Sequence, residues 1–251
     1  MNSIMAPVAI QEPGNYHAKG PIPESRVAPV AGHGPMQANF SPYMDNGGTI
    51  AAIAGENFVV LAADTRLSLG YAILSRDNSK MSALTPKCYI ASSGMNADIT
   101  TLHKVLKMRA VQYQQKHGKD MSCHAAANLL SRTLYYKRFF PYYTFNLLVG
   151  VDNEGKGAVY KYDAIGNIEQ VPYASAGSGS SLIQPFMDNQ VGFKTHQIIE
   201  NESRTVEETV EFMKDMFSSA GERDIYTGDA IEIAVITPEG AHIEKFALKD
   251  D

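Results

Sequence analysis

Two neighbouring apolar runs predict a β-hairpin. Residues 49–54 and 58–65 are rich in apolar and β-branched side chains, and Gly55, Glu56 and Asn57 between them favour a turn. Both runs are apolar at alternate and at intervening positions, whereas an antiparallel sheet usually exposes one face to water. We therefore expect both faces of the hairpin to be covered, by helices on one side and by a second sheet on the other.

Six further apolar runs predict strands elsewhere in the chain. They cover residues 87–92, 144–151, 157–162, 168–173, 230–237 and 241–248. The segments 152–155, 164–167 and 238–240 lie between consecutive runs and carry the Gly, Pro, Asn and Asp residues that favour tight turns. We expect these strands to pair in antiparallel fashion.

Apolar residues at helical spacing predict four helices. Asp98 is the expected N-cap of the first and Ser122 that of the second. A third helix is expected over residues 180–190, and Thr205 with Glu208 forms a capping box for the fourth. Helices in pairs between antiparallel strands predict an α+β fold with helices outside a pair of sheets, and not a doubly wound α/β fold.

The first 39 residues differ in composition from the rest of the chain. They hold six of its 12 prolines and show no apolar periodicity, so we expect a disordered leader at 1–39. The remaining residues show no internal repeat and no second linker. Residues 40–251 are therefore predicted to form one domain.

Charge and cysteine content exclude several classes of protein. The net charge is −5 and the 22 Lys and Arg residues are spread along the chain, so we expect no nucleic-acid partner. Cys88 and Cys123 lack metal-ligand spacing, which favours reduced thiols in an intracellular protein. No apolar run is long enough to span a bilayer and no secretion signal is visible, so we expect neither secretion nor membrane insertion.

The sequence contains no convincing cofactor-binding or metal-binding motif. The segment 150–157 is close to a phosphate-binding loop, but Gly157 replaces the required Ser or Thr and the segment leads into a predicted strand. A hairpin turn is the better interpretation. The seven His residues show no ligand spacing, so no metal and no cofactor are expected.

Six of the 23 Phe and Tyr residues lie between Tyr135 and Tyr143. This aromatic block is either core at a helix-to-strand corner or a protein–protein contact, because aromatic and Arg residues dominate binding hot spots. The segment 189–193 is a second candidate for a contact.

Several motifs together carry a family resemblance. They are Gly47-Gly48-Thr49-Ile50, the run from Val60 to Arg66, Ser79-Lys80, Ser93-Gly94, Gly177-Ser178-Gly179 and the run from Asp224 to Asp229. In this order, and over residues 40–248, the chain closely resembles the beta-type subunits of the proteasome core particle. The resemblance implies a four-layer αββα sandwich of the Ntn-hydrolase type.

The resemblance also implies a role and partners. The subunit would help to build the proteolytic chamber of the 20S particle for ubiquitin-dependent protein degradation, in the cytoplasm and nucleus. Its partners would be other alpha- and beta-type subunits in stacked heptameric rings. The segments 39–43, 138–143 and 188–193 resemble one noncatalytic member, which implies processing near Asn39 or Phe40.

In catalytic members of the family a Thr becomes the first residue after self-cleavage, and its hydroxyl attacks the peptide carbonyl. A Lys lowers the pKa of the Thr amine, an Asp holds the Lys, and a backbone N–H stabilises the oxyanion. The resemblance maps the Asp, the Lys and the oxyanion donor onto Asp64, Lys80 and Gly94. The outer supports of the site map onto Ser178, Asp224 and Thr227.

The spacing of Asp64 and Lys80 shows that Thr49 does not occupy the nucleophile position of the catalytic members. Catalytic members place the Asp 16 residues and the Lys 32 residues after the Thr, whereas Asp64 and Lys80 follow Thr49 by 15 and 31. The nucleophile position is therefore Gly48, which has no hydroxyl, and a one-residue shift in a strand turns Thr49 to the opposite face. We expect a noncatalytic structural subunit. The alternative is an active N-terminal threonine protease with Thr49 as nucleophile.

Overall fold

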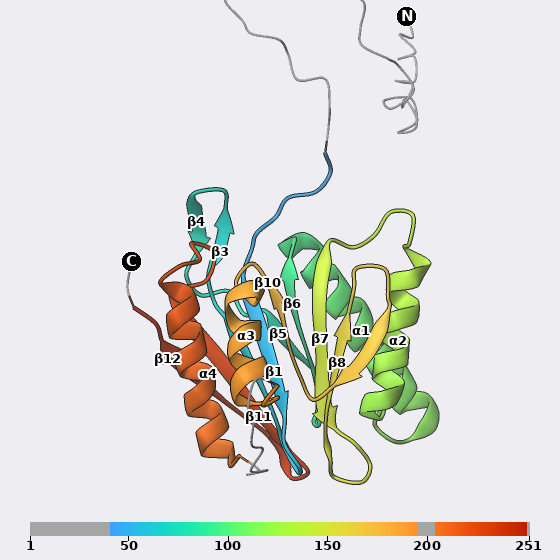
Figure 1. Ribbon diagram of the computed structural model, residues 1–251. Helices are drawn as coiled ribbons and strands as arrows, with labels where there is room; N and C mark the ends of the chain where they lie inside the picture. Colours follow the sequence, from blue (N-terminus) through green and yellow to red (C-terminus); the bar gives the residue numbers. More distant parts are fainter. Residues whose placement is uncertain (1–40, 195–203, 250–251) are drawn as a thin grey trace, which may run out of the picture. The chain divides into compact units, whose positions relative to one another are not determined.

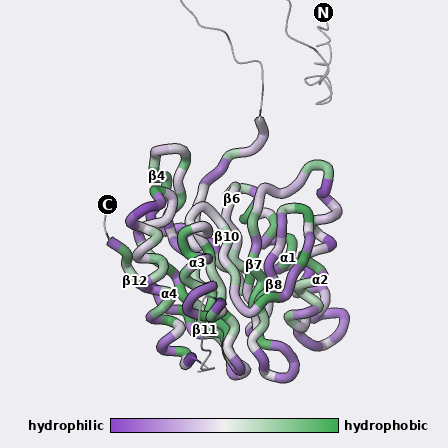
Figure 2. The backbone as a smooth tube through the Cα atoms, viewed as in Figure 1, coloured by the Kyte–Doolittle hydropathy of each residue, from purple (hydrophilic) through white to green (hydrophobic). Residues whose placement is uncertain are grey.

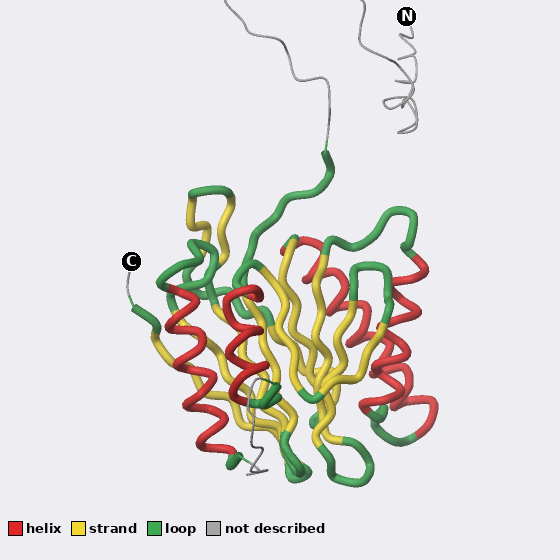
Figure 3. The backbone as a smooth tube through the Cα atoms, viewed as in Figure 1, coloured by secondary structure: helices red, strands yellow, loops and turns green. Residues whose placement is uncertain are grey.

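Two five-stranded antiparallel sheets are stacked between two layers of helices (Figures 1 and 3). The structure is a computed structural model that describes residues 41–194 and 204–249. These elements all belong to the part of the chain that begins at Tyr43. The four layers confirm the predicted αββα sandwich. The predicted leader, with Asn39 and Phe40, lies outside the described residues.

The first sheet has the strand order β10-β1-β2-β11-β12. Its strands are β1 (Thr49–Ala54), β2 (Val59–Asp64), β10 (Tyr173–Gly177), β11 (Ala230–Thr237) and β12 (Gly240–Ala247). β1 and β2 form the predicted hairpin, with Ala54 opposite Val59. This sheet therefore combines strands from near the start and near the end of the described chain.

The second sheet has the order β5-β6-β7-β8-β9 and follows the chain. Its strands are β5 (Met81–Thr85), β6 (Cys88–Gly94), β7 (Thr144–Val151), β8 (Gly157–Tyr162) and β9 (Ile168–Val171). A small separate hairpin consists of β3 (Leu67–Leu69) and β4 (Ala72–Ser75).

Within the described residues, four helices cover the outer faces of the sheets. They are α1 (Asn96–His117), α2 (Cys123–Tyr136), α3 (Ser180–Gln190) and α4 (Val206–Gly221). The helices α1 and α2 pack on the second sheet, while α3 and α4 pack on the first. Figure 2 shows hydrophilic residues in turns at both the upper and the lower end of the view and along parts of the outer helices.

The two-sided burial expected for the first hairpin is confirmed. Ile50 and Ala52 pack into the core between the two sheets, and Ala51 and Ile53 pack against the helices α3 and α4. All four side chains are buried. β1, which is apolar from Ile50 to Ala54, thus lies at the centre of the sandwich, where both of its faces are dry.

The strand predicted over 168–173 is wrong in one respect, because it is two strands in different sheets. The chain leaves the second sheet after Val171 and enters the first at Tyr173. Pro172 lies between them and cannot donate a ladder hydrogen bond. Its carbonyl accepts one from the Ala54 N–H at 2.8 Å, which starts the pairing of β10 with β1.

Asp98 does not cap α1, which begins two residues earlier. The N-cap is Met95, and the Asp98 carboxylate instead accepts a hydrogen bond from the Tyr143 N–H at 2.8 Å. The predicted caps Ser122 and Thr205 are confirmed, and Thr205 forms the complete capping box with Glu208.

The phosphate-loop-like segment is a hairpin turn, as expected. One Asp152 carboxylate oxygen accepts the Glu154 and Lys156 N–H groups between β7 and β8, at 2.8 and 2.9 Å. Cys88 and Cys123 are buried free thiols with their Sγ atoms 3.9 Å apart. Across residues 41–194 and 204–249, no helix has the length and apolarity that a membrane span requires.

Candidate functional site

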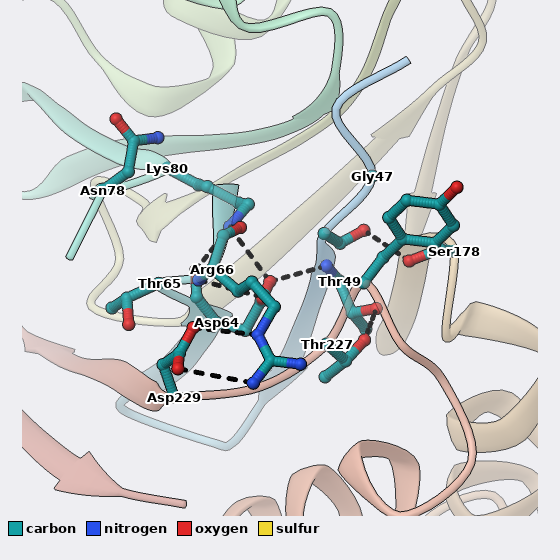
Figure 4. A network of polar contacts seen from close by, with 12 residues as sticks. Gly47, Thr49, Asp64, Thr65, Arg66, Asn78, Lys80, Ser178, Thr227 and Asp229 are labelled. Atoms are coloured by element: carbon teal, nitrogen blue, oxygen red, sulfur yellow. Dashed lines mark hydrogen bonds and ion pairs between the residues drawn. The ribbon is translucent and has the colours of Figure 1, made fainter. Parts of the chain in front are cut away.

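Lys80 and Asp64 form a buried ion pair at one end of the first sheet (Figure 4). The Lys80 Nζ lies 3.2 Å from Asp64 Oδ1 and also donates to the carbonyls of Asp64 at 2.9 Å and Arg66 at 2.7 Å. Burial raises the pKa of the Asp64 carboxyl, and the Lys80 charge opposes that rise. Three acceptors therefore fix the ammonium group in one place.

Gly48 faces this ammonium group. A Cβ built on Gly48 would lie 2.1 Å from Lys80 Cε and 3.0 Å from Nζ, so the lysine fills the space where a side chain would be. The backbone of Gly48 has φ +91°, a conformation that favours glycine. Its carbonyl accepts a hydrogen bond from the Ser178 N–H at 3.0 Å. The position aligned with the family nucleophile is thus closed by Lys80.

Thr49 points away from Lys80, as the alternation of a strand requires. Its hydroxyl accepts a hydrogen bond from the Gly179 N–H at 2.8 Å and lies 2.7 Å from the Thr227 hydroxyl. Its backbone nitrogen is a peptide N–H that donates to Asp64 Oδ1 at 2.7 Å. Thr49 therefore ties β1 to the β10–α3 turn.

The three outer residues converge on the same place. The Asp224 Oδ2 atom accepts hydrogen bonds from the hydroxyls of Ser178 and Thr227, both at 2.6 Å. Since Thr227 donates its proton to Asp224, Thr49 is the donor in the contact between the two threonines. The structure thus joins the predicted outer residues to Thr49 and not to Lys80.

The chain upstream of Gly48 is hydrogen-bonded to the residues beside this site. The Asn46 N–H donates to the Gly94 carbonyl at 3.1 Å, and the Asn46 side-chain amide donates to the Ser68 carbonyl at 2.9 Å. The Gly94 N–H, which the resemblance assigns to the oxyanion, donates to the Gly47 carbonyl at 3.4 Å. The protein's own backbone therefore occupies this donor.

A buried ion pair between Arg66 and Asp229 is a feature that the sequence patterns did not reveal. Arg66 Nε lies 2.8 Å from Asp229 Oδ2, and Arg76 also pairs with Asp229. Burial tends to raise the pKa of Asp229, but hydrogen bonds from the two arginines hold it below the usual value. A Cβ on Gly228 would lie 2.4 Å from Arg66 Cζ, so the glycine makes room for the guanidinium. Arg66 and Asp229 both lie inside the quoted motifs, and only their opposite charges signalled the contact.

Metal binding has no support in the described part of the chain, where no group of three or more His, Cys, Asp or Glu residues is placed to hold an ion. The site is instead built from an ion pair, hydroxyls and backbone groups. These are the residues that the resemblance assigned to the family's chemistry.

Comparison with known proteins decides the family. The family model described as proteasome subunit matches residues 44–236. The chain belongs to the proteasome subunit family. Proteasome subunit beta type-1 of Petunia hybrida is 51% identical over 220 residues, which cover 86% of this chain and 99% of the relative. The beta type-1 subunit of Dictyostelium discoideum is 50% identical over 232 residues, covering 92% and 97%.

The beta type-1 subunit of Arabidopsis thaliana is also 51% identical over 220 residues, which cover 86% of this chain and 99% of the relative. The prediction of a beta-type proteasome subunit is therefore confirmed. The noncatalytic member that the three short segments indicated is beta type-1, the name that these relatives carry. Membership in this family implies assembly with other proteasome subunits.

Proposed function

We propose that this proteasome subunit is a noncatalytic structural member of the beta ring, in its sixth place. The observation that carries the proposal is Gly48 at the position facing Lys80, where a catalytic subunit needs a hydroxyl. Lys80 and Asp64 remain as an ion pair without a nucleophile to activate. The site then contributes to the stability of the subunit and not to peptide hydrolysis.

An active protease with Thr49 as nucleophile is not favoured. The Thr49 hydroxyl is engaged with Gly179 and Thr227, on the side away from Lys80. Its nitrogen is a peptide N–H that cannot serve as the base, because only a free amine has the lone pair to accept a proton. Cleavage before Thr49 would free that amine but would leave the hydroxyl facing the wrong way.

The role is one of assembly. The subunit would pack with alpha- and beta-type neighbours in stacked heptameric rings and help to enclose the chamber for ubiquitin-dependent degradation. We place it in the cytoplasm and nucleus and propose that residues 1–39 are removed near Asn39 or Phe40.

Treatment of purified particles with a threonine-directed electrophile tests the proposal. Peptide mapping should find adducts on active subunits of the same particle, which serve as the internal control, and none on Thr49. Mapping should also recover a peptide that spans Gly48 and Thr49 uncut. A covalent adduct on Thr49, or a mature terminus at that residue, would overturn the assignment.

A further inference from the structure

Four aromatic side chains stand exposed where α2 ends and the chain turns toward β7. They are Tyr135, Tyr136, Phe139 and Phe140, which we call the aromatic ridge. Tyr136 is 91% exposed and Phe139 is 94% exposed, so these side chains are not core within the single chain. Clusters of large exposed apolar groups are uncommon on soluble proteins unless something binds there.

Basic side chains are stacked on the ridge. The Arg138 guanidinium carbon lies 5.4 Å from the ring centre of Phe139 and 5.7 Å from that of Tyr135, and Lys137 Nζ lies 5.4 Å from that of Phe140. Arg132 is exposed one turn earlier on α2, and residues 131–143 include no acidic residue. The surface is thus apolar and positive, on a chain whose net charge is −5.

A mostly apolar groove of about 510 Å³ runs beside the ridge. Its walls are the end of α2, from Ser131 to Tyr136, and the β8–β9 turn at 165–167. The Ser131 hydroxyl donates to the Gly166 carbonyl at 2.6 Å, and a Cβ on Gly166 would lie only 2.3 Å from the Ser131 carbonyl oxygen. The two walls are therefore locked together, and the groove exists before anything binds.

The connection that carries the ridge is also fixed on its other side. The Tyr43 hydroxyl donates to the Pro141 carbonyl at 2.8 Å, and the Tyr43 ring stacks on Phe140 with 5.6 Å between ring centres. The Asp98 carboxylate holds the Tyr143 N–H. The backbone of this connection and the Phe140 ring are therefore held in place, which limits the conformational entropy that they lose on binding.

We propose that the ridge and groove are the docking surface for a different proteasome subunit, whose contact segment places an apolar side chain in the groove and carboxylates beside Arg132 and Arg138. This inference rests on the proposed function and names the kind of partner. A two-fold contact with a second copy is disfavoured, because it would bring the cations of residues 131–143 face to face, and that stretch holds no acidic residue to pair with them.

Photo-crosslinking identifies the occupant. A photoreactive phenylalanine analogue replaces Phe139 in the full chain, and the particle is isolated after irradiation. We expect a crosslinked peptide from a different proteasome subunit that contains Asp or Glu. A crosslink only to a second copy of this chain, or none in an assembled particle, overturns the inference while the proposed function stands. A wild-type chain that never enters the particle would instead overturn the proposed function.

Two double variants separate loss of the rings from loss of the fold. Tyr136→Ser with Phe139→Ser removes both rings, whereas Tyr136→Phe with Phe139→Tyr keeps them and is the matched control. Because both side chains are almost fully exposed, circular dichroism of the unassembled chains should show the same fold. In competition with wild-type chain, the Ser variant should lose incorporation by about thirtyfold or more, the typical effect at one hot-spot residue.

The control variant should enter the particle as well as wild type, and Arg138→Glu should reduce entry because it reverses the charge offered to the carboxylates. Equal incorporation of the Ser variant and wild type would show that the ridge is not a docking surface. If that variant assembled normally but lost binding to anionic phosphatidylserine vesicles, the surface would be one for membranes and the proposal would also fail.

Discussion

At the scale of single residues, the absence of one side chain determines what the site can do. Lys80 reaches across Gly48 to its three acceptors, and the hydroxyl next along the chain, on Thr49, faces the other way. The arrangement keeps the Lys80–Asp64 ion pair and places a glycine, which has no hydroxyl, beside it. Substitutions at Gly48 and at the ion pair should show what these residues now contribute to stability.

Gly48→Ala should destabilise the fold by on the order of 2–4 kcal/mol, because its Cβ would displace Lys80 and the backbone φ is positive. Gly70→Ala is the matched control, since Gly70 has φ +58° but no neighbouring atom within 4 Å of the place where a Cβ would lie. The control should lose only about 1–2 kcal/mol. Urea unfolding measures both, and equal losses would mean that Lys80 moves aside at no cost.

Asp64→Ala should be more damaging than removal of both charges. The single change leaves a buried ammonium group without its carboxylate and should cost on the order of 3–5 kcal/mol. Asp64→Asn with Lys80→Met keeps an acceptor for the Thr49 N–H and leaves no charge, so it should be milder. If urea unfolding showed equal losses for the two proteins, the pair would not be mutually compensating.

At the scale of elements, a buried histidine joins a helix to two strands. His103 of α1 contacts the Ser82 hydroxyl of β5 through Nδ1 at 3.0 Å and the Ser92 hydroxyl of β6 through Nε2 at 2.8 Å. Ser92 donates its own proton to Asn146 Oδ1 at 2.6 Å, so His103 Nε2 carries the proton that Ser92 accepts. The neutral imidazole therefore fits this network.

Stability should fall in mild acid because of His103. Burial, and the nearby charge of Lys107, lower its pKa to about 4, against about 6.5 in the unfolded chain. Below pH 6.5 His103 becomes protonated in the unfolded chain but stays neutral in the folded protein. The folded state is therefore destabilised relative to the unfolded state as the pH falls from 6.5 to 4. The loss is about 3 kcal/mol.

Urea unfolding at pH 7 and pH 4 measures this effect in wild type and in His103→Gln, which keeps a polar side chain that does not titrate. The variant should lose about 3 kcal/mol less than wild type between the two pH values. The same loss in both proteins would assign the acid sensitivity to other groups.

Sequence patterns predicted the elements whose signals are local. The caps at Ser122 and Thr205 and the two-sided burial of β1 follow from neighbouring residues, and the structure confirms them. The switch of sheets at Pro172 and the pairing of Asp98 with Tyr143 depend on distant partners, which periodicity does not reveal. β3 and β4 were missed because they are short and mostly exposed, and β5 because it is a half-exposed edge strand.

At the scale of the whole molecule, the sequence was sufficient to predict that Gly48 and not Thr49 faces Lys80, because the spacing to Asp64 and Lys80 decides this. The position of Asn46 and Gly47 beside the site could not be predicted, since it depends on hydrogen bonds to the distant residues Ser68 and Gly94.

Removal of the leader is the prediction at this scale. Without a hydroxyl at position 48 the chain cannot cut itself by the family mechanism, so we expect a neighbouring active subunit to trim it near Asn39 or Phe40. Intact-mass measurement of the subunit from assembled particles should show that residues 1–39 are absent. Inhibition of the active subunits during assembly should preserve them. A full-length mass in untreated particles would contradict this prediction.

The strand order also determines when each sheet can form during synthesis of the chain. The second sheet with α1 and α2 comes from one continuous stretch, residues 81–171, and can pack as soon as that stretch has emerged. β1 must wait for β10, because Ile53 pairs with Tyr173, 120 positions later. At about 5–20 residues per second, the delay is roughly 6 to 24 seconds. During that interval the apolar β1–β2 hairpin has two open edges, which are the kind that recruit other chains, so a nascent subunit is most prone to aggregation before its last strands are made.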